Sequence, residues 1–213
     1  MVLILVLLLF GIRTSGFQTF LAHQASSYLS KELGTEIRID KVDIVFVDII
    51  DIKGIYVEDK IKDTLLSTGE IRVNISGFDF AIPKIDIEEV LLADATVNLI
   101  KYKNDTTFNF QHLVDYFATE SEDTSSTKFE LNVAKVILSN VNFKFHDENS
   151  EAVLNGMDFA NIGVNNLSGT LSQFGLQGDS ILVKVEDLGF GERSGLKLVN
   201  LSADVLYSPQ LIS

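Results

Sequence analysis

The hydrophobic pattern of this chain changes its period at residue 35, and that change constrains the fold more than any other feature. Before it, apolar residues from Phe17 to Leu33 recur every three or four positions, which predicts one helix. After it, apolar and polar residues alternate in short runs that begin with Ile37 and Ile39. Alternation with a period of two is typical of half-buried strands in antiparallel sheets. The chain is therefore predicted to be mostly β, with one long amphipathic helix before the strands.

The helix is expected to start with Ser15 as its N-cap and to end at Leu33, with Gly34 as the C′ residue. Two interpretations of its apolar stripe remain open. The stripe packs against the end of the sheet, or the helix lies on a membrane surface. We favour the first, because the polar side lacks the Lys/Arg-rich character of interfacial helices. The stripe consists of Phe17, Phe20, Leu21, Ala25, Tyr28, Leu29 and Leu33.

The first twelve residues, MVLILVLLLFGI, carry no charge. A helix that crosses a bilayer needs about 20 apolar residues, so we expect residues 1–12 to be part of an uncleaved membrane anchor. A cleaved signal peptide is the first alternative, although the apolar run lacks a basic region before it and a clean cleavage site after it. A buried core segment is the second. Either membrane interpretation places the remainder of the chain outside the cytoplasm.

Polar breaks divide the chain after the helix, which occupies residues 13–34. Residues 35–118 form a first β segment that ends in a short predicted helix at 111–118. Phe108 and Phe110, just before this helix, are predicted to lie in a short strand. Residues 119–128 contain no apolar side chain and are predicted to be a solvated loop. Residues 129–213 form a second β segment, which we expect to continue in a longer natural protein.

The two β segments contain a weak internal repeat. Residues 90–99 can be laid over residues 136–143, and each stretch follows another strand. A repeat of strand units favours a growing array of strands over a closed catalytic domain.

Composition and motifs argue against several functional classes. The chain has 17 Lys and Arg against 30 Asp and Glu, a net charge of −13, which argues against nucleic-acid binding. It has no Cys, which excludes disulfides, thiolate zinc sites and iron–sulfur clusters. None of its three His has a second ligand at metal-binding spacing, and hydrolase, phosphate-loop and calcium-loop motifs are absent. We therefore predict no catalytic, cofactor or metal site and no enzymatic activity.

The order of these features resembles one family. The stretches that carry the resemblance follow the apolar N-terminus in the order Phe17–Ala22, Tyr28–Thr35, Gly54–Asp59, Asp63–Leu66, Ile71–Val73, Ala93–Leu99 and Phe108–Phe110. Together they resemble the N-terminal region of the TamB-like translocation and assembly module proteins, within the AsmA-like superfamily. The similarity covers about residues 1–145 well and the rest loosely.

The resemblance implies a single-pass inner-membrane protein with its bulk in the periplasm. Members of this family are long, curved β-sheets with an apolar concave face, similar to bridge-like lipid-transfer proteins. The implied roles are phospholipid transport towards the outer membrane and outer-membrane assembly, with an outer-membrane assembly protein as a partner. This sequence is much shorter than most members, and a shorter AsmA-like relative and a truncated reading frame are the two explanations that we consider.

The residues themselves also favour an apolar groove. A sheet with one apolar face must cover that face, and one helix of about 20 residues spans only about 30 Å. Phospholipid acyl chains would cover the rest, whereas an ordinary sandwich core is the alternative. A second functional hypothesis is an adaptor module that binds a protein partner by strand addition at an open sheet edge. The predicted groove residues are Phe46, Val97, Leu99, Phe108, Phe110, Phe129, Val141, Phe143 and Phe145.

Overall fold

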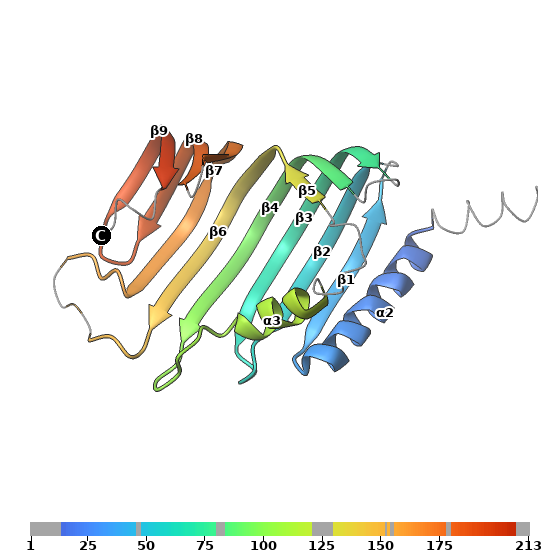
Figure 1. The fold of residues 1–213 in the computed structure, drawn as a ribbon, viewed down its shortest axis with the longest axis horizontal. Helices are drawn as coiled ribbons and strands as arrows, with labels where there is room; N and C mark the ends of the chain where they lie inside the picture. Colours follow the sequence, from blue (N-terminus) through green and yellow to red (C-terminus); the bar gives the residue numbers. More distant parts are fainter. Residues whose placement is uncertain are drawn as a thin grey trace, which may run out of the picture.

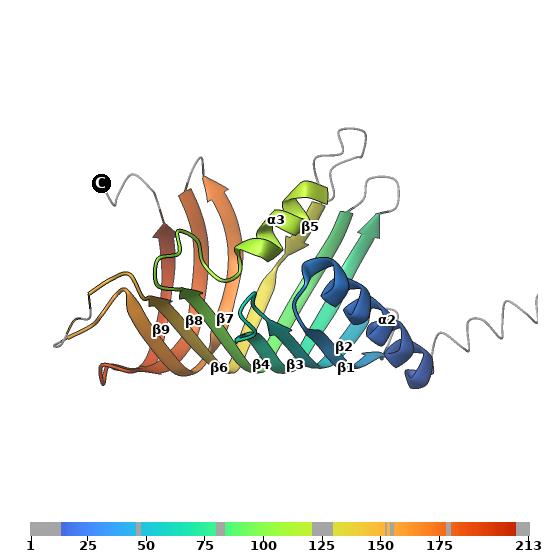
Figure 2. The same ribbon diagram turned by 90° about the horizontal axis from the view of Figure 1, so that it is seen from below.

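The computed structural model describes residues 14–45, 48–79, 84–120, 130–151, 153, 156–177 and 180–207. Within them, one open, curved sheet of nine strands carries two helices (Figures 1 and 2). The predicted anchor at 1–12 lies outside the described residues, and no helix in the described part is long and apolar enough to cross a bilayer. The elements are α2 (Ser15–Leu33), β1 (Ile37–Ile44), β2 (Ile49–Glu58), β3 (Thr64–Asp79), β4 (Lys84–Lys101), α3 (Gln111–Glu120), β5 (Glu130–Val133), β6 (Lys135–Asp147), β7 (Asn161–Gln177), β8 (Ser180–Glu192) and β9 (Lys197–Tyr207).

The strands follow the order β1-β2-β3-β4-β6-β7-β8-β9, with β5 paired to β4. Most neighbours are antiparallel, as predicted, but β4 pairs in parallel with both β5 and β6. Parallel neighbours need a crossover connection, and the stretch from Lys101 to Glu130, which contains α3, provides it. The two predicted β segments therefore join in one sheet, and the described residues do not form a two-sheet sandwich.

The parallel pair of β4 and β6 brings the two copies of the internal repeat side by side. Val90 pairs with Val136 and Val97 pairs with Phe143, which is the register of the sequence overlay. Both copies also have a left-handed residue at the equivalent position, Asp94 and Asn140. The structure thus supports the repeat that the sequence predicts.

A line of left-handed residues bends the sheet. Asp94 in β4, Asn140 in β6, Asn166 in β7 and Asp187 in β8 have φ angles of 50°, 54°, 53° and 53°. The strand register shifts at the last three of these positions, as expected at β-bulges, which bend the strands that contain them. Asn140 Nδ2 also donates to Asp94 Oδ1 at 2.6 Å, which links the left-handed residues of β4 and β6. The long strands consequently curve towards one side, as Figure 2 shows.

The left-handed conformation of Asn140 predicts that glycine destabilises this position less than alanine does, the reverse of the usual order in a strand. Glycine takes the left-handed conformation without strain, whereas a Cβ there costs about 1–2 kcal/mol unless the residue is Asn or Asp. Asn140→Gly should therefore be more stable than Asn140→Ala in urea unfolding. At the preceding exposed residue, Ser139, the alanine variant should be the more stable of the two. The same order at both positions would contradict this origin of the bend.

Helix α2 occupies the predicted residues but has a different cap and a different buried face. Thr14 is the N-cap, so Ser15 is the first helical residue, while Gly34 ends the helix at φ 67° as predicted. The buried face is Gln18, Ala22, Ser26 and Leu33, each 6% exposed or less. Of the predicted stripe only Leu33 is buried, and Leu29 is half-buried. Its larger members point outward: Phe17, Phe20, Leu21 and Tyr28 are 41%, 55%, 49% and 57% exposed.

The outer edge of β1 explains this orientation. An edge strand presents unpaired backbone groups, which polar side chains can satisfy. Gln18 Oε1 accepts a hydrogen bond from Ile44 N at 3.0 Å. Ser30 Oγ accepts from Ile37 N at 2.8 Å and donates to Ile37 O at 3.0 Å. Helix α2 therefore binds both ends of this edge with polar side chains, as its position along β1 in Figure 1 allows.

The segment before α3 corrects another prediction. Phe108 and Phe110 lie in a turn and not in a strand. Asn109, between them, bonds to β4 as a paired strand residue would. Asn109 N donates to Ile100 O at 2.8 Å, and its side-chain Oδ1 accepts from Ile100 N at 3.0 Å. The short helix predicted at 111–118 is confirmed as α3.

The turn between β8 and β9 is organised by the Glu192 carboxylate. Glu192 Oε2 accepts from Ser194 N at 2.7 Å, and Oε1 accepts from Gly163 N in β7 at 3.1 Å. These bonds, with one from the Ser194 hydroxyl as the largest contribution, lower the pKa of Glu192 from 4.5 to about 2.

This pKa shift predicts an acid-sensitive contribution to stability. The folded pKa lies below the unfolded value, so the contribution is complete above about pH 4.5 and is lost as the pH falls towards 2. Glu192→Gln should therefore lower the urea midpoint at neutral pH and approach the wild-type midpoint near pH 2. Glu151→Gln, at an exposed position, is the control. A Glu192→Gln defect of the same size at both pH values would contradict the prediction.

Candidate functional site

One face of the sheet carries a continuous row of apolar side chains that crosses six strands. Directly paired residues on neighbouring strands share a face. We call this set the apolar row; all its members are half-buried except Val57, which is 8% exposed. The row runs through Ile37, Val57, Leu66, Val97, Phe143 and Val164. Beside it, Leu99, Phe145 and Ile162 are aligned in the same way on β4, β6 and β7.

Aromatic side chains from the turn before α3 pack on this face. The Phe108 ring centroid lies 5.1 Å from that of Phe145 and 5.9 Å from that of Phe110. Helix α3 follows directly and lies on the concave side of the sheet (Figure 2). The apolar row therefore lies on the concave side, where Phe108 packs against Phe145 beside it.

The structure brings most of the predicted groove residues together. Val97, Leu99, Phe143 and Phe145 are neighbours in the β4–β6 ladder, and Phe108 and Phe110 pack next to them. Val141 is 4% exposed and belongs to the close packing at the bend. Phe46 and Phe129 lie outside the described residues.

A hydrogen-bond network holds the turn with Phe108 and Phe110 in place. At its centre is Asp59, in the turn between β2 and β3, which is 1% exposed. Asp59 Oδ1 accepts from Ile61 N at 3.0 Å and Asp63 N at 2.9 Å. Asp59 Oδ2 accepts from Tyr102 Oη at 2.5 Å and Asn109 Nδ2 at 3.2 Å. The network ties the β2–β3 turn to the end of β4 and the start of α3.

Two side chains near Asp59 have shifted pKa values. Burial, followed by the hydrogen bond to Asp59, raises the pKa of Tyr102 well above its ordinary value of 10. Tyr102 therefore keeps its proton and remains a donor to the carboxylate. Burial lowers the pKa of the nearby His112, whose Nδ1 lies 2.9 Å from Asn109 O.

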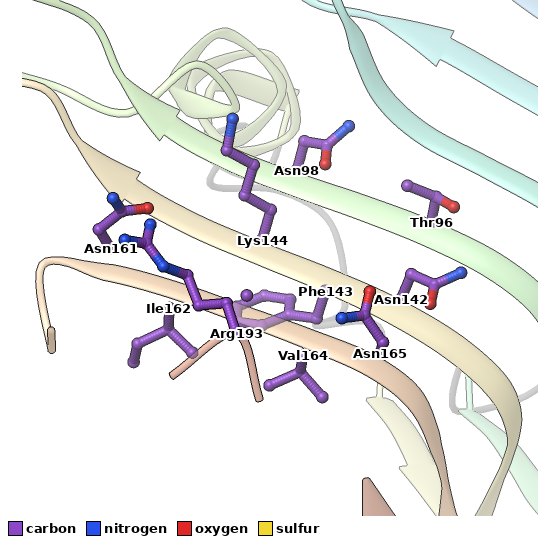
Figure 3. Close-up of a pocket in the computed structure, with 11 residues that line it drawn as sticks. Thr96, Asn98, Asn142, Phe143, Lys144, Asn161, Ile162, Val164, Asn165 and Arg193 are labelled. Atoms are coloured by element: carbon purple, nitrogen blue, oxygen red, sulfur yellow. The ribbon is translucent and has the colours of Figure 1, made fainter. Parts of the chain in front are cut away.

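The opposite face of the same strands is polar. Thr96, Asn98, Asn142 and Lys144 alternate with the apolar residues of β4 and β6 and surround a shallow hollow of about 320 Å³ (Figure 3). The stem of Arg193 lies across Gly163, where a Cβ would be 3.3 Å from Arg193 Cδ. Along residues 96–99 of β4 and 142–145 of β6, polar side chains therefore lie on one face and apolar side chains on the other.

Sequence patterns alone did not identify Ile37, Val57, Leu66, Ile162 and Val164 as groove residues. Their alternation is visible in the sequence, but their alignment with Val97 and Phe143 depends on strand register. The Asp59 network was also missed, because Asp59 stands in a polar stretch that reads as an ordinary surface turn. The only signals in the sequence were Tyr102, directly after β4, and Asn109, shortly before α3.

Comparison of the chain with protein-family models, with curated proteins and with solved structures finds no match.

Proposed function

We propose that this protein is a non-enzymatic envelope factor whose concave apolar face carries phospholipid acyl chains between the inner and outer membranes, or assists outer-membrane assembly. The observation that supports this best is the apolar row. It crosses six paired strands, its side chains are mostly half-buried, and the described residues place no second sheet over it. Acyl chains are a natural partner for such a surface, because they bury it without hydrogen-bonding requirements.

The proposed location is the inner membrane, with residues 1–12 as a single-pass anchor and the bulk of the chain in the periplasm. The support is the uncharged sequence of Met1–Ile12 together with the resemblance to TamB-like proteins. An outer-membrane assembly protein is the proposed partner at the far end.

Native mass spectrometry of the full chain tests the lipid proposal most directly. Protein released gently from detergent should carry bound phospholipid, visible as added masses that solvent extraction removes. Protein that is free of phospholipid under conditions that preserve the fold would contradict the proposal.

The sheet also has one edge that supports the second hypothesis, an adaptor that binds a protein strand. Among the described strands β9 pairs only with β8, and Val199, Leu201, Val205 and Leu206 on β9 are 80%, 40%, 41% and 50% exposed. The β1 edge, in contrast, is bound by α2. A photocrosslinker at Val199 should form adducts in cells, whereas one at the exposed Ser139 in β6, a central strand, should not.

A further inference from the structure

Helix α2 has its apolar side on the outside. Its outward face carries Phe17, Phe20, Leu21 and Tyr28, all more than 40% exposed, together with the exposed polar residues Gln24, Lys31 and Glu32, while the side against β1 contains Gln18 and Ser26. In a helix that simply covers a sheet the arrangement is the reverse. Large apolar side chains gathered on the outer side of a helix offer a surface to another apolar phase.

The size of the outward face favours lipid over a protein. Four large side chains of about 200 Å² each, roughly half exposed, offer about 400 Å². A stable protein–protein interface needs about 800 Å² from each partner. A second copy of the chain or another protein would therefore find too little surface on α2 alone.

Charge and sequence context point the same way. The chain carries a net charge of −13, but the charged residues of α2 are Lys31 and Glu32, which cancel. The helix is thus a neutral part of an acidic protein, and the uncharged apolar stretch Met1–Ile12 stands immediately before it. Phe and Tyr side chains are also well suited to the boundary between acyl chains and headgroups.

We propose that the outward face of α2 binds the interface of a phospholipid bilayer, with the helix parallel to the membrane plane. Such a helix buries its apolar face by about 5–10 Å at the headgroup boundary. Because α2 lies along β1, the binding places the β1 edge of the sheet at the membrane (Figure 1). The proposal shares its membrane location with the proposed function but does not depend on lipid transport.

The chain has no Cys, so single cysteines can report the environment of each side of α2. Leu21→Cys lies on the outward face, and His23→Cys, two residues on, points about 200° away around the helix. Both positions are exposed, so a bimane label should not disturb the fold. The full-length labelled protein is reconstituted in phosphatidylcholine vesicles, with brominated lipid or aqueous iodide as quencher. Vesicle flotation reports membrane attachment separately.

Brominated lipid should quench the Leu21→Cys label severalfold more than the His23→Cys label, and iodide should show the opposite preference. Iodide quenching of both labels to the same extent in floated vesicles would overturn the proposal while leaving the anchor intact. Quenching of both labels by brominated lipid would indicate a spanning helix. Protection of the Leu21→Cys label from iodide without quenching by lipid would indicate a protein partner. Either result would overturn the proposal. Loss of flotation would overturn the membrane location as well.

Discussion

The Phe143→Asp variant is expected to fold and to lose its bound phospholipid. Phe143 lies in the middle of the apolar row, paired with Val97 on β4 and Val164 on β7, and it is half-buried on the concave face. On an open groove the new carboxylate stays hydrated, so the variant should lose only about 1–2 kcal/mol in free energy of unfolding. Acyl chains cannot pack against a charge, so phospholipid occupancy measured by native mass spectrometry should fall about tenfold or more.

The neighbouring residue provides a matched control. Asn142 precedes Phe143 in β6 but lines the polar hollow on the opposite face. Asn142→Asp adds the same charge to the same strand and should leave lipid occupancy unchanged. If Phe143→Asp aggregates or loses its cooperative unfolding transition, the face is a closed core, in which an unpaired charge costs several kcal/mol. Retention of lipid by a folded Phe143→Asp variant would contradict the groove equally.

The strands themselves were predictable because alternation reports local burial. Val97 and Leu99 alternate with Thr96 and Asn98, and the structure places the two sets on opposite faces of β4. Which strand lies next to β4 was not predictable. Period two assigns residues to faces within a strand, whereas the parallel pairing of β4 with β6 depends on a crossover through α3. The sequence overlay of the two repeats was the one signal of that register.

Helix α2 shows why a correct periodicity can lead to a wrong buried face. The prediction assumed that a helix packs through its apolar stripe, which is true against an apolar core. The partner here is the edge of β1, whose unpaired backbone groups select Gln18 and Ser30. Sequence analysis could locate the stripe but not the partner. The position of Phe20, 55% exposed, is therefore a tertiary property that the helical pattern does not contain.

The Asp59 network is hidden from sequence for a related reason. The turn Glu58–Asp63 is polar except for the exposed Ile61 and looks solvated. Tyr102 and Asn109, which bond the Asp59 carboxylate, are 43 and 50 residues away. A buried, fully bonded carboxylate is therefore a consequence of how the β2–β3 turn meets the end of β4.

Asp59→Ala is expected to cause the largest loss of stability among single substitutions in the described part of the chain. The change removes the acceptor of two backbone N–H groups and one of the two acceptors of both Tyr102 Oη and Asn109 Nδ2, at a carboxylate that is 1% exposed. Buried donors without a partner cost about 1–3 kcal/mol each before relaxation and hydration. We expect a net loss of about 3–5 kcal/mol in the free energy of unfolding, measured in urea. Asp63→Ala, an exposed carboxylate 3.3 Å from Tyr102 Oη, should cost about 1 kcal/mol or less.

A double-mutant cycle separates this network from a general effect of the turn. Tyr102→Phe removes one donor, so Asp59→Ala should cost less in the Tyr102→Phe background, with a coupling of about 1 kcal/mol or more. Additive effects would show that the two residues act independently, and the network would then not hold the turn. Because Asn109 lies between Phe108 and Phe110, the loss of Asp59 should also loosen the cover of the apolar face. A fluorescent label on a cysteine placed at Phe110 should then become more accessible to iodide in Asp59→Ala than in Asp63→Ala, at a temperature where both variants are folded.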